Sequence, residues 1–447
     1  MPPPRRREQL GMAQLLGALA TLRMAQALGT PLLPPAFCTE AATTARGKTT
    51  WHDRDAADLY SQEMASAMAA LSTLAHCSWI PGYGTTPLTS CGEPCSFAGL
   101  AIQHGGRHAI HPSLTHSVYA VAFTRASDAT VENVPEKGCV LAFRGSFISN
   151  HTTYMSDQRL VPWQWEDDNA DSEHCGDDCR VHADYYQRWL ELKAQTFGYL
   201  GELGCSPGSS VYVTGHSEGA AVATLAMVSL RLAGYDVQVS YTFGAPRVGN
   251  EQFAAFFDGV FRRKVSAFRV THGPDRYPKI PRRGQGFHSV GYQVWYPSDD
   301  PDDYVICSGA FLDPTCGTDG LPFECTVRPS LEGPHCMHPL APAISPYGFC
   351  IQGVPGSSST VPGMGSSAPD LMDMQVQANM ACLRWFKSEE VPITIGVPDS
   401  GSDWMEDTVE AEGGPEAAAQ LEQAQEQAVA EASRGAGAQV CCFTIGF

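Results

Sequence analysis

The stretch YVTGHSEGAAVATLAM, residues 212–227, constrains the fold more than any other part of the sequence. A β-branched apolar run stops at Gly-His-Ser-Glu-Gly and continues at once as an Ala- and Leu-rich helix. A chain that turns from strand to helix within about five residues needs small residues on both sides of the turn. Gly215 and Gly219 supply them, and Ser217 therefore stands at the apex.

The G-x-S-x-G spacing between a strand and a helix is typical of a nucleophile elbow. Such a turn would expose Ser217 Oγ above the sheet and aim the helix N-terminus, with the Glu218 amide, at negative charge forming beside it. The plainer interpretation is a tight turn without chemistry. Because of the strand–helix context, we predict that Ser217 is a nucleophile and that the Glu218 amide helps to bind an oxyanion.

A serine nucleophile needs a base, and the base needs an orienting acid. In sheets of this kind the chain order is Ser, then Asp or Glu, then His. The segment FRVTHGPDRYPKIP supplies Asp275 after a later strand, where the acid is expected. His272 stands nearby, but the order demands a carboxylate here, so we predict a structural role for His272.

Strand and helix patterns alternate through the middle of the chain. The predicted helices are residues 53–76, 183–204, 220–234 and 251–263, and the predicted strands are residues 116–125, 137–146, 211–213, 237–250, 265–275 and 288–297. This alternation predicts an α/β fold, with a largely parallel sheet covered by helices on both faces. We expect a targeting segment and linker in residues 1–50, a catalytic domain in 51–352, and a linker with an acidic tail, helical or disordered, in 353–447.

Charge and cysteine content limit the partners and the compartment. A formal net charge of -19 disfavours nucleic acid as a partner, because there is no basic surplus to neutralise phosphates. The 16 cysteines include Cys91 with Cys95 and Cys175 with Cys179, each pair with three intervening residues, whereas zinc knuckles usually have two. Disulfide bonds in an oxidising compartment are therefore favoured over zinc, and no metal site is expected.

The N-terminus has a basic start, an apolar stretch and Ala25-Gln26-Ala27, which is typical of a cleavable signal peptide. We predict the secretory pathway or an extracellular location, and a plastid transit peptide is the alternative. No uninterrupted apolar run reaches the roughly 18 residues needed to span a bilayer, so no transmembrane segment is expected.

Five motifs in register carry a family resemblance. VLAFRGS, VTGHSEG, TFGAPRVGN, HGPDRYPKIP and VGYQVWY occur in the order and approximate spacing of class 3 lipases, the fungal triacylglycerol lipase-like family. The resemblance covers about residues 52 to 352. It implies an α/β-hydrolase-type fold, no cofactor, and a disulfide between Cys307 and Cys316.

Taken position by position, the resemblance implies Ser217 as the nucleophile and Asp275 as the acid of a triad. It implies Ser146, at the end of FRGS, as the other contributor to the oxyanion site through its amide and its hydroxyl. Arg144 and His182 match positions often filled the same way in the family, and we interpret both as structural supports.

The base is the residue where the sequence departs from the family pattern. The family places its histidine after the cysteine pair, commonly in an Asp-His unit, whereas this chain reads CTVRPSLEGPHCMHPLAPAISPYGF. The lead-in Ser-Leu-Glu, residues 330–332, makes His335 the nearest counterpart. His338 is the main alternative, and His288, which matches a non-catalytic family position, is the third.

Two further departures concern the rim of the expected site. Glu218 replaces the usual apolar residue, and its carboxylate would oppose oxyanion formation unless it faces solvent or pairs with a base. The segment FISNHTTYMSD, residues 147–157, stands where the family has a lid helix and has apolar residues at helical spacing. It also holds a glycosylation sequon at Asn150, and LVPWQW, residues 160–165, is a candidate acyl groove.

These observations predict a serine carboxylic ester hydrolase that acts on acyl lipids at a lipid–water interface through an acyl-enzyme. One alternative is an esterase for more polar esters, such as feruloyl or galactolipid substrates. The other is an inactive relative that binds a lipid or a partner, because the Asp-His unit is missing.

Overall fold

The computed structural model describes residues 59–76, 93–146 with short gaps, 159–163, 175–262, 267–307, 316–327 and 333–341, with a few isolated positions between 38 and 42, at 349, 395–396 and 408–409. The expected signal peptide, the lid segment with its sequon, and nearly all of the acidic tail lie outside the described residues. No helix among the described residues is long and apolar enough to cross a membrane.

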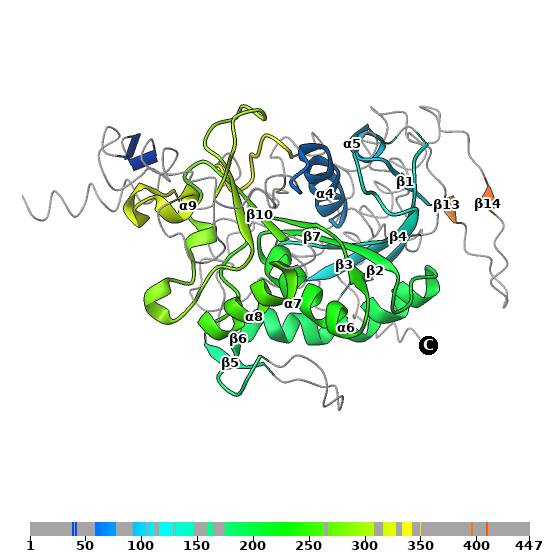
Figure 1. Cartoon of the computed structure of the whole chain (residues 1–447), viewed down its shortest axis with the longest axis horizontal. Coiled ribbons are helices and arrows are strands. Elements are labelled where there is room, and N and C mark those ends of the chain that lie inside the picture. The colour runs from blue at the N-terminus through cyan, green and yellow to red at the C-terminus, as the bar shows by residue number, and fades with distance from the viewer. Residues whose placement is uncertain are drawn as a thin grey trace, which may run out of the picture.

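The described helices and strands follow one another along the chain as labelled in Figure 1. They are α4 (Gln62–Leu74), α5 (Glu93–Phe97), β1 (Leu100–Ile102), β2 (Arg107–Ile110), β3 (Ser117–Arg125), β4 (Lys137–Phe143), β5 (Leu160–Pro162), β6 (Arg180–His182), α6 (Ala183–Glu202), β7 (Ser210–His216), α7 (Glu218–Leu232), β8 (Asp236–Val237), β9 (Ser240–Phe243), α8 (Glu251–Arg262), β10 (Ala267–His272), η1 (Tyr277–Lys279), η2 (Arg283–Gln285), β11 (Tyr292–Tyr296), β12 (Val305–Ile306), α9 (Gly317–Gly320), η3 (Phe323–Cys325), β13 (Ile395–Gly396) and β14 (Thr408–Val409).

The main sheet has ten strands. Its order is β1-β3-β4-β7-β9-β10-β11-β12, with β2 paired to β3 and β8 paired to β7. Neighbours are parallel from β4 to β11, whereas the pairings of β1, β2 and β4 with β3, and of β12 with β11, are antiparallel. The predicted α/β-hydrolase-type fold with a mainly parallel sheet is therefore confirmed.

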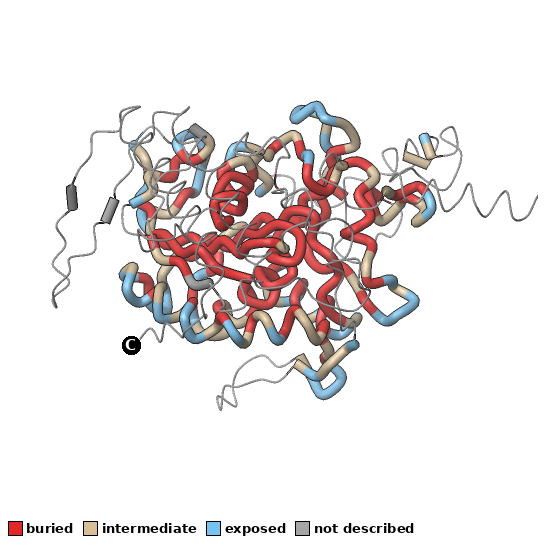
Figure 2. Tube along the Cα trace, turned by 180° about the vertical axis from the view of Figure 1, so that it is seen from behind, coloured by how far each residue is buried: buried red, intermediate tan, exposed pale blue. Residues whose placement is uncertain are grey.

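Side chains alternate between two apolar cores, one on each face of the sheet. In β4, Val140 and Ala142 lie in the core that α4 covers, whereas Cys139, Leu141 and Phe143 lie in the core that α6, α7 and α8 cover. Figure 1 shows α4 on one side of the strands and α6, α7 and α8 on the other, and Figure 2 shows the buried interior between them. Two covered faces explain why the strands read as nearly continuous apolar runs.

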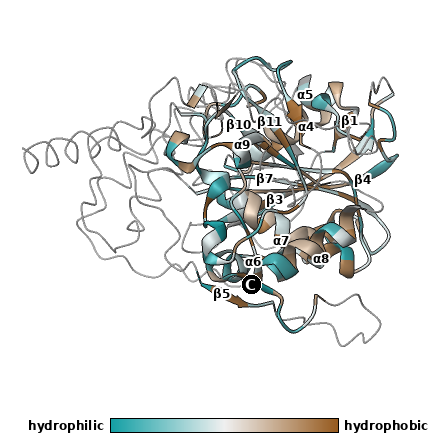
Figure 3. Ribbon diagram, turned by 60° about the vertical axis from the view of Figure 1, so that its left-hand side comes forward, coloured by the Kyte–Doolittle hydropathy of each residue, from teal (hydrophilic) through white to brown (hydrophobic). Residues whose placement is uncertain are grey.

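The helices differ in how much of their surface they bury. α7 is buried along nearly its whole length, whereas α6 buries one side through residues such as Tyr185, Trp189 and Leu192 and exposes the other. Figure 3 shows the same contrast, with α7 pale to brown and α6 carrying teal segments. A helix that is apolar all round belongs inside a fold, and α7 is therefore fixed rigidly behind the elbow.

Helix ends follow local capping chemistry. α4 begins later than the predicted residue 53, because the Ser61 hydroxyl accepts a hydrogen bond from Met64 N (3.1 Å) and so caps the helix. α6 ends as expected before Gly204, which has a φ of +79° and takes the left-handed conformation that favours glycine.

Four disulfide bonds link cysteines among the described residues. Cys307 is bonded to Cys316 and Cys175 to Cys179, and two longer links join Cys38 to Cys325 and Cys139 to Cys205. The predicted preference for disulfides over zinc is confirmed for Cys175 and Cys179. Within the described ranges no group of three or more His, Cys, Asp or Glu residues is arranged to hold a metal ion.

Candidate active site

The elbow is a strained turn between β7 and α7. Ser217 has a φ of 57° and a ψ of -126°, a conformation that is costly for a residue with a side chain. A Cβ atom on Gly215 would lie 2.6 Å from the carbonyl carbon of Gly219, and one on Gly219 would collide with the backbone oxygen of Phe143, so neither position has space for a side chain. Ser217 N donates to Phe243 O on β9 (2.8 Å). The turn is thereby held in one conformation with the Ser217 side chain above the sheet.

Ser217, His335 and Asp275 form one continuous hydrogen-bonded chain. His335 Nε2 lies 2.9 Å from Ser217 Oγ, and His335 Nδ1 lies 2.8 Å from Asp275 Oδ2. All three side chains are buried, with exposed fractions of 5% or less. An ionised Asp275 only accepts hydrogen bonds, which assigns the proton to Nδ1 and leaves Nε2 free to accept the Ser217 hydroxyl proton.

Asp275 is fixed by the loop between β10 and η1. Its second oxygen, Oδ1, accepts a hydrogen bond from Tyr277 N (2.9 Å), so the carboxylate cannot rotate away from His335 without losing that bond. Asp275 also forms a bridge with Val327, and Arg276 Nε donates to Thr326 Oγ1 (3.1 Å). These contacts fasten the acid to the segment that leads toward the base.

Two imidazoles from neighbouring strand ends hold the backbone of the His335 loop. His216 Nε2 donates to His335 O (2.8 Å), and His272 Nδ1 donates to Pro334 O (3.2 Å). Burial lowers the pKa of His216 well below its usual value, and the proximity of His335 lowers it further. His216 therefore stays neutral, with one N–H available for the carbonyl. A structural role was expected for His272, whereas His216, directly before Ser217 in the sequence, was not singled out.

Gly244, just after β9, gives the His335 ring its space. A Cβ atom there would lie 3.0 Å from His335 Cε1, and the φ of Gly244 is +57°. Tyr277 packs on the other side of the ring, with centroids 4.5 Å apart. Gly244 belongs to the TFGAPRVGN motif of the sequence, but its contact with the His335 ring is visible only in the folded structure.

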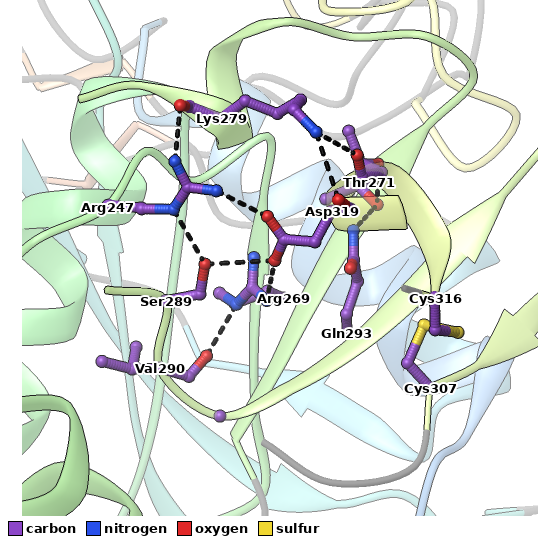
Figure 4. Close-up of polar contacts among 12 residues, drawn as sticks. Arg247, Arg269, Thr271, Lys279, Ser289, Val290, Gln293, Cys307, Cys316 and Asp319 are labelled. Atoms are coloured by element: carbon purple, nitrogen blue, oxygen red, sulfur yellow. Dashed lines mark hydrogen bonds and ion pairs between the residues drawn. A yellow bond between two sulfur atoms is a disulfide. The ribbon is translucent and has the colours of Figure 1, made fainter. Parts of the chain in front are cut away.

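A buried ionic cluster fastens α9 to η1 and β10, beside the loop that carries Asp275 (Figure 4). Asp319 pairs with Arg247 Nη2 (2.6 Å) and lies 3.6 Å from Arg269 Nη2. Lys279 Nζ donates to the carbonyls of Thr318 and Asp319. Burial alone would raise the pKa of Asp319, but the surrounding cations outweigh it and hold that pKa at about 2. No sequence motif pointed to this cluster, because these residues come from four separate segments of the chain.

The rim beside Ser217 is formed by the end of β4. Phe143 is in register with Gly215 of β7, and a Cβ atom on Gly145 would lie 3.3 Å from Ser217 Cβ. Ser146 follows directly, so it stands beside the elbow where an oxyanion would form. Its hydroxyl donates to the Glu218 carboxylate, which also pairs with Arg188 Nε (2.8 Å).

Comparison with known proteins agrees with this geometry. A family model described as Lipase (class 3) matches residues 140–284, which include Ser146, Ser217 and Asp275. This part of the chain is therefore similar to class 3 lipases. His335 lies beyond the matched residues, which is consistent with the departure from the family pattern in this part of the sequence.

Two curated relatives and one solved structure illustrate the similarity. Lipase A of Sodiomyces alcalophilus is 28% identical over 273 residues, covering 55% of this chain and 66% of the relative. Secreted mono- and diacylglycerol lipase 2 of Gibberella zeae is 30% identical over 261 residues, covering 54% and 58%. The chain thus spans less than two thirds of the length of either relative. Lipase II from Rhizopus niveus is 22% identical, with a TM-score of 0.44, covering 59% of this chain and 90% of that one.

The two other candidate histidines, His338 and His288, lie apart from the Ser217–His335–Asp275 chain. His338 packs among aromatic rings, including Phe243 and Tyr296, and its Nδ1 accepts a hydrogen bond from Leu340 N (3.1 Å). Burial lowers the pKa of His338 well below its usual value, and the nearby His272 lowers it further. His288 pairs through its backbone with Gly249, where β6 and the loop before α8 meet.

The two residues that we interpreted as supports, Arg144 and His182, are both buried. His182 precedes α6, and its ring stacks on Tyr185 with centroids 4.0 Å apart. Arg144 is 2% exposed. Burial and the neighbouring Arg188 lower the pKa of Arg144 to about 9, an effect that Glu218 opposes. Arg144 therefore keeps its positive charge at neutral pH.

Proposed function

We propose that this protein hydrolyses carboxylic esters of acyl lipids through an acyl-enzyme on Ser217. The observation that carries the proposal is the hydrogen-bonded chain from Ser217 through His335 to Asp275 at a strained strand–helix turn. The class 3 lipase family match supports the same chemistry. A serine alcohol is a poor nucleophile by itself, and this arrangement supplies the base and the orienting acid that it requires.

In the proposed reaction, Ser217 Oγ attacks the ester carbonyl while its proton passes to His335 Nε2. Asp275 accepts the hydrogen bond of Nδ1–H and stabilises the imidazolium that forms. The amides of Ser146 and Glu218 face the developing oxyanion, an interaction whose loss typically costs about 10²–10³ in rate. His335 then protonates the leaving alkoxide, and water repeats the sequence to release the acid and regenerate Ser217.

Among the candidate bases, we assign His335. It has both a nucleophile within 2.9 Å and a carboxylate within 2.8 Å. His338 instead accepts a hydrogen bond from a backbone amide and lies in an aromatic environment that keeps it neutral. The geometry supports a complete triad, and this argues against an inactive relative that lost its base.

Acylglycerols are the substrate class that we favour. Curated relatives from Gibberella zeae and Penicillium cyclopium are named mono- and diacylglycerol lipases. The buried triad requires a segment to open or a groove to admit the acyl chain, which suits a substrate presented at a lipid–water interface. A more polar ester, such as a galactolipid, remains the alternative, since Glu218 adds a polar group next to the nucleophile.

Hydrolysis rates on a substrate series test the proposal. The wild-type chain is assayed on mono-, di- and triacylglycerols and on a galactolipid, beside a Ser217→Ala variant. Fluorophosphonate labelling, which reports a reactive serine, accompanies each assay. We expect labelling and acylglycerol hydrolysis in the wild type and neither in Ser217→Ala. A well-folded wild type that is not labelled would support the inactive relative, and galactolipid preference would support the polar esterase.

We also propose that residues 51–352 form the catalytic domain and that the protein enters the secretory pathway. Phe349 stacks on His216 with ring centroids 4.6 Å apart, which supports a domain that extends past His335. Disulfides such as Cys38–Cys325, and the secreted lipases among the relatives, favour an oxidising compartment over a plastid. Fusion of residues 1–50 to a fluorescent reporter tests this: export supports secretion, and plastid import supports the alternative.

A further inference from the structure

The carboxylate of Glu218 joins two parts of the proposed oxyanion site. Glu218 is the residue directly after the nucleophile and the first residue of α7, and it is 5% exposed. Its Oε2 accepts a hydrogen bond from Ser146 Oγ, and its Oε1 lies 2.8 Å from Arg188 Nε on α6. A single side chain thus connects α6, the start of α7 and the loop after β4.

A serine hydroxyl has one hydrogen, so the bond that Ser146 Oγ donates to Glu218 uses its whole donor capacity. The hydroxyl in this arrangement acts as a tether, and the groups left to face an oxyanion are the amides of Ser146 and Glu218. This differs from the expectation that Ser146 contributes through both its amide and its hydroxyl.

The tether addresses a physical requirement of the site. β4 ends at Phe143, and Arg144 N still donates to Ser117 O (3.0 Å), but Ser146 stands two residues further on. An oxyanion donor is effective only if its position is fixed before the charge develops. The buried Glu218 carboxylate holds Ser146 in place by accepting the hydrogen bond of its hydroxyl.

A carboxylate beside an oxyanion would be costly unless its charge were balanced. Burial raises the pKa of Glu218, Asp184 on α6 raises it further, and Arg188 and Arg144 oppose both effects. Tyr185, also on α6, is close enough for Glu218 to raise the tyrosine pKa. Arg188 pairs directly with the Glu218 carboxylate, and Arg144 adds a second positive charge nearby, so the negative charge of Glu218 is balanced beside the oxyanion site.

We propose that Arg188 and Glu218 are a positioning pair that holds Ser146 through its hydroxyl and so sets the oxyanion site of the proposed hydrolase. The Arg188 and Glu218 side chains act through the Ser146 hydroxyl, a role separate from that of the Glu218 backbone amide in the oxyanion site. The inference rests on the proposed function, because it concerns the transition state of that reaction.

The test measures kcat and KM per fluorophosphonate-labelled site for Arg188→Met, Arg188→Lys, Ser146→Ala and the double variant Arg188→Met with Ser146→Ala. The matched control is Arg231→Met, which removes another arginine, at the far end of α7, paired with Asp236 at 3.7 Å. Counting labelled sites removes the contribution of unfolded molecules, so a poorly folding variant still gives an interpretable rate.

We expect Arg188→Met to lower kcat about tenfold to hundredfold with little change in KM, because the lost interaction acts in the transition state. Arg188→Lys recovers part of the loss, and Arg231→Met stays close to the wild type. The double variant loses no more than the larger single loss, because both changes break the same tether. If the two losses multiply, the Ser146 hydroxyl is an independent oxyanion donor and the tether is wrong.

The pH profile separates positioning from simple packing. Arg188→Met removes a cation that lowers the pKa of Glu218, so protonation of Glu218 and loss of kcat move to higher pH. Position 218 cannot ionise in Glu218→Gln, so the acid limb of this variant is expected to lack the contribution of Glu218. Identical acid limbs in the wild type, Arg188→Met and Glu218→Gln would overturn the inference. Absence of ester hydrolysis in the wild type would instead overturn the proposed function.

Discussion

His335 Nε2 lies 2.9 Å from Ser217 Oγ, although 118 positions separate the two residues in the chain. The loop that carries His335 reaches the elbow because its backbone is held by His216 and His272, each from the end of a strand next to the site. Ser217, the proposed nucleophile, is therefore positioned by local turn geometry, whereas His335, the proposed base, is positioned by contacts from other strands.

Substitutions of His335 and His338 distinguish between the two candidate bases. We expect His335→Ala to lower kcat by about 10⁴ or more, because removal of any triad member leaves only the oxyanion site and substrate binding. His338→Ala removes a ring that touches neither Ser217 nor Asp275, so its kcat per labelled site stays within about fivefold of the wild type. Ester hydrolysis by purified, folded variants measures both, and a larger loss in His338→Ala would refute the assignment.

The second prediction concerns the close packing of Gly244 against the His335 ring. Gly244→Ala places a Cβ atom 3.0 Å from His335 Cε1 and forces a side chain onto a φ of +57°. We expect kcat to fall about 10²-fold, since misplacing the base by a fraction of an ångström is costly. The control is Gly208→Ala, where φ is +92° but no atom lies within 4 Å of the added Cβ. It should lose stability without losing activity.

How far the sequence predicted this structure depends on how local each interaction is. The strained elbow and the alternation of strands with helices follow from short motifs and periodicity, whereas the Cys307–Cys316 bond was implied by the family resemblance. His216 and Gly244 were present in recognised motifs, but their function depends on a ring that arrives from more than 90 residues away. The cluster around Asp319 could not be predicted at all, because its partners gather only after β10, β11 and α9 have packed.

The Asp319 cluster predicts a specific dependence of stability on pH. The pKa of Asp319 is lowered from 3.8 to about 2 in the folded state, so the charged form favours folding. The ionised carboxylate contributes about 2 kcal/mol to the free energy of unfolding. This contribution is fully present above about pH 4 and is lost as the pH falls toward 2. Asp319→Asn abolishes this acid-dependent step and destabilises the protein near pH 7, because Arg247 and Arg269 lose their buried partner.

Urea denaturation of the wild type and Asp319→Asn at several pH values between 2 and 7 measures this effect. The control is Asp236→Asn, which removes an exposed carboxylate paired with Arg231 at 3.7 Å, where little change is expected. Parallel stability curves for the wild type and Asp319→Asn across the acid range would contradict the prediction.

The last prediction concerns the disulfide between Cys307 and Cys316, which is bonded directly before α9. Because α9 carries Asp319, the bond supports the ionic cluster beside the Asp275 loop. Replacing both cysteines by serine should lower the free energy of unfolding by about 2–3 kcal/mol, as expected for a loop of this length. Replacing Cys175 and Cys179, whose bond closes a shorter loop away from Asp275, is the matched control. We expect the first variant to lose activity on warming before its far-ultraviolet circular dichroism changes, because the acid loosens first. Simultaneous loss of both signals would indicate that α9 and the triad unfold only with the whole domain.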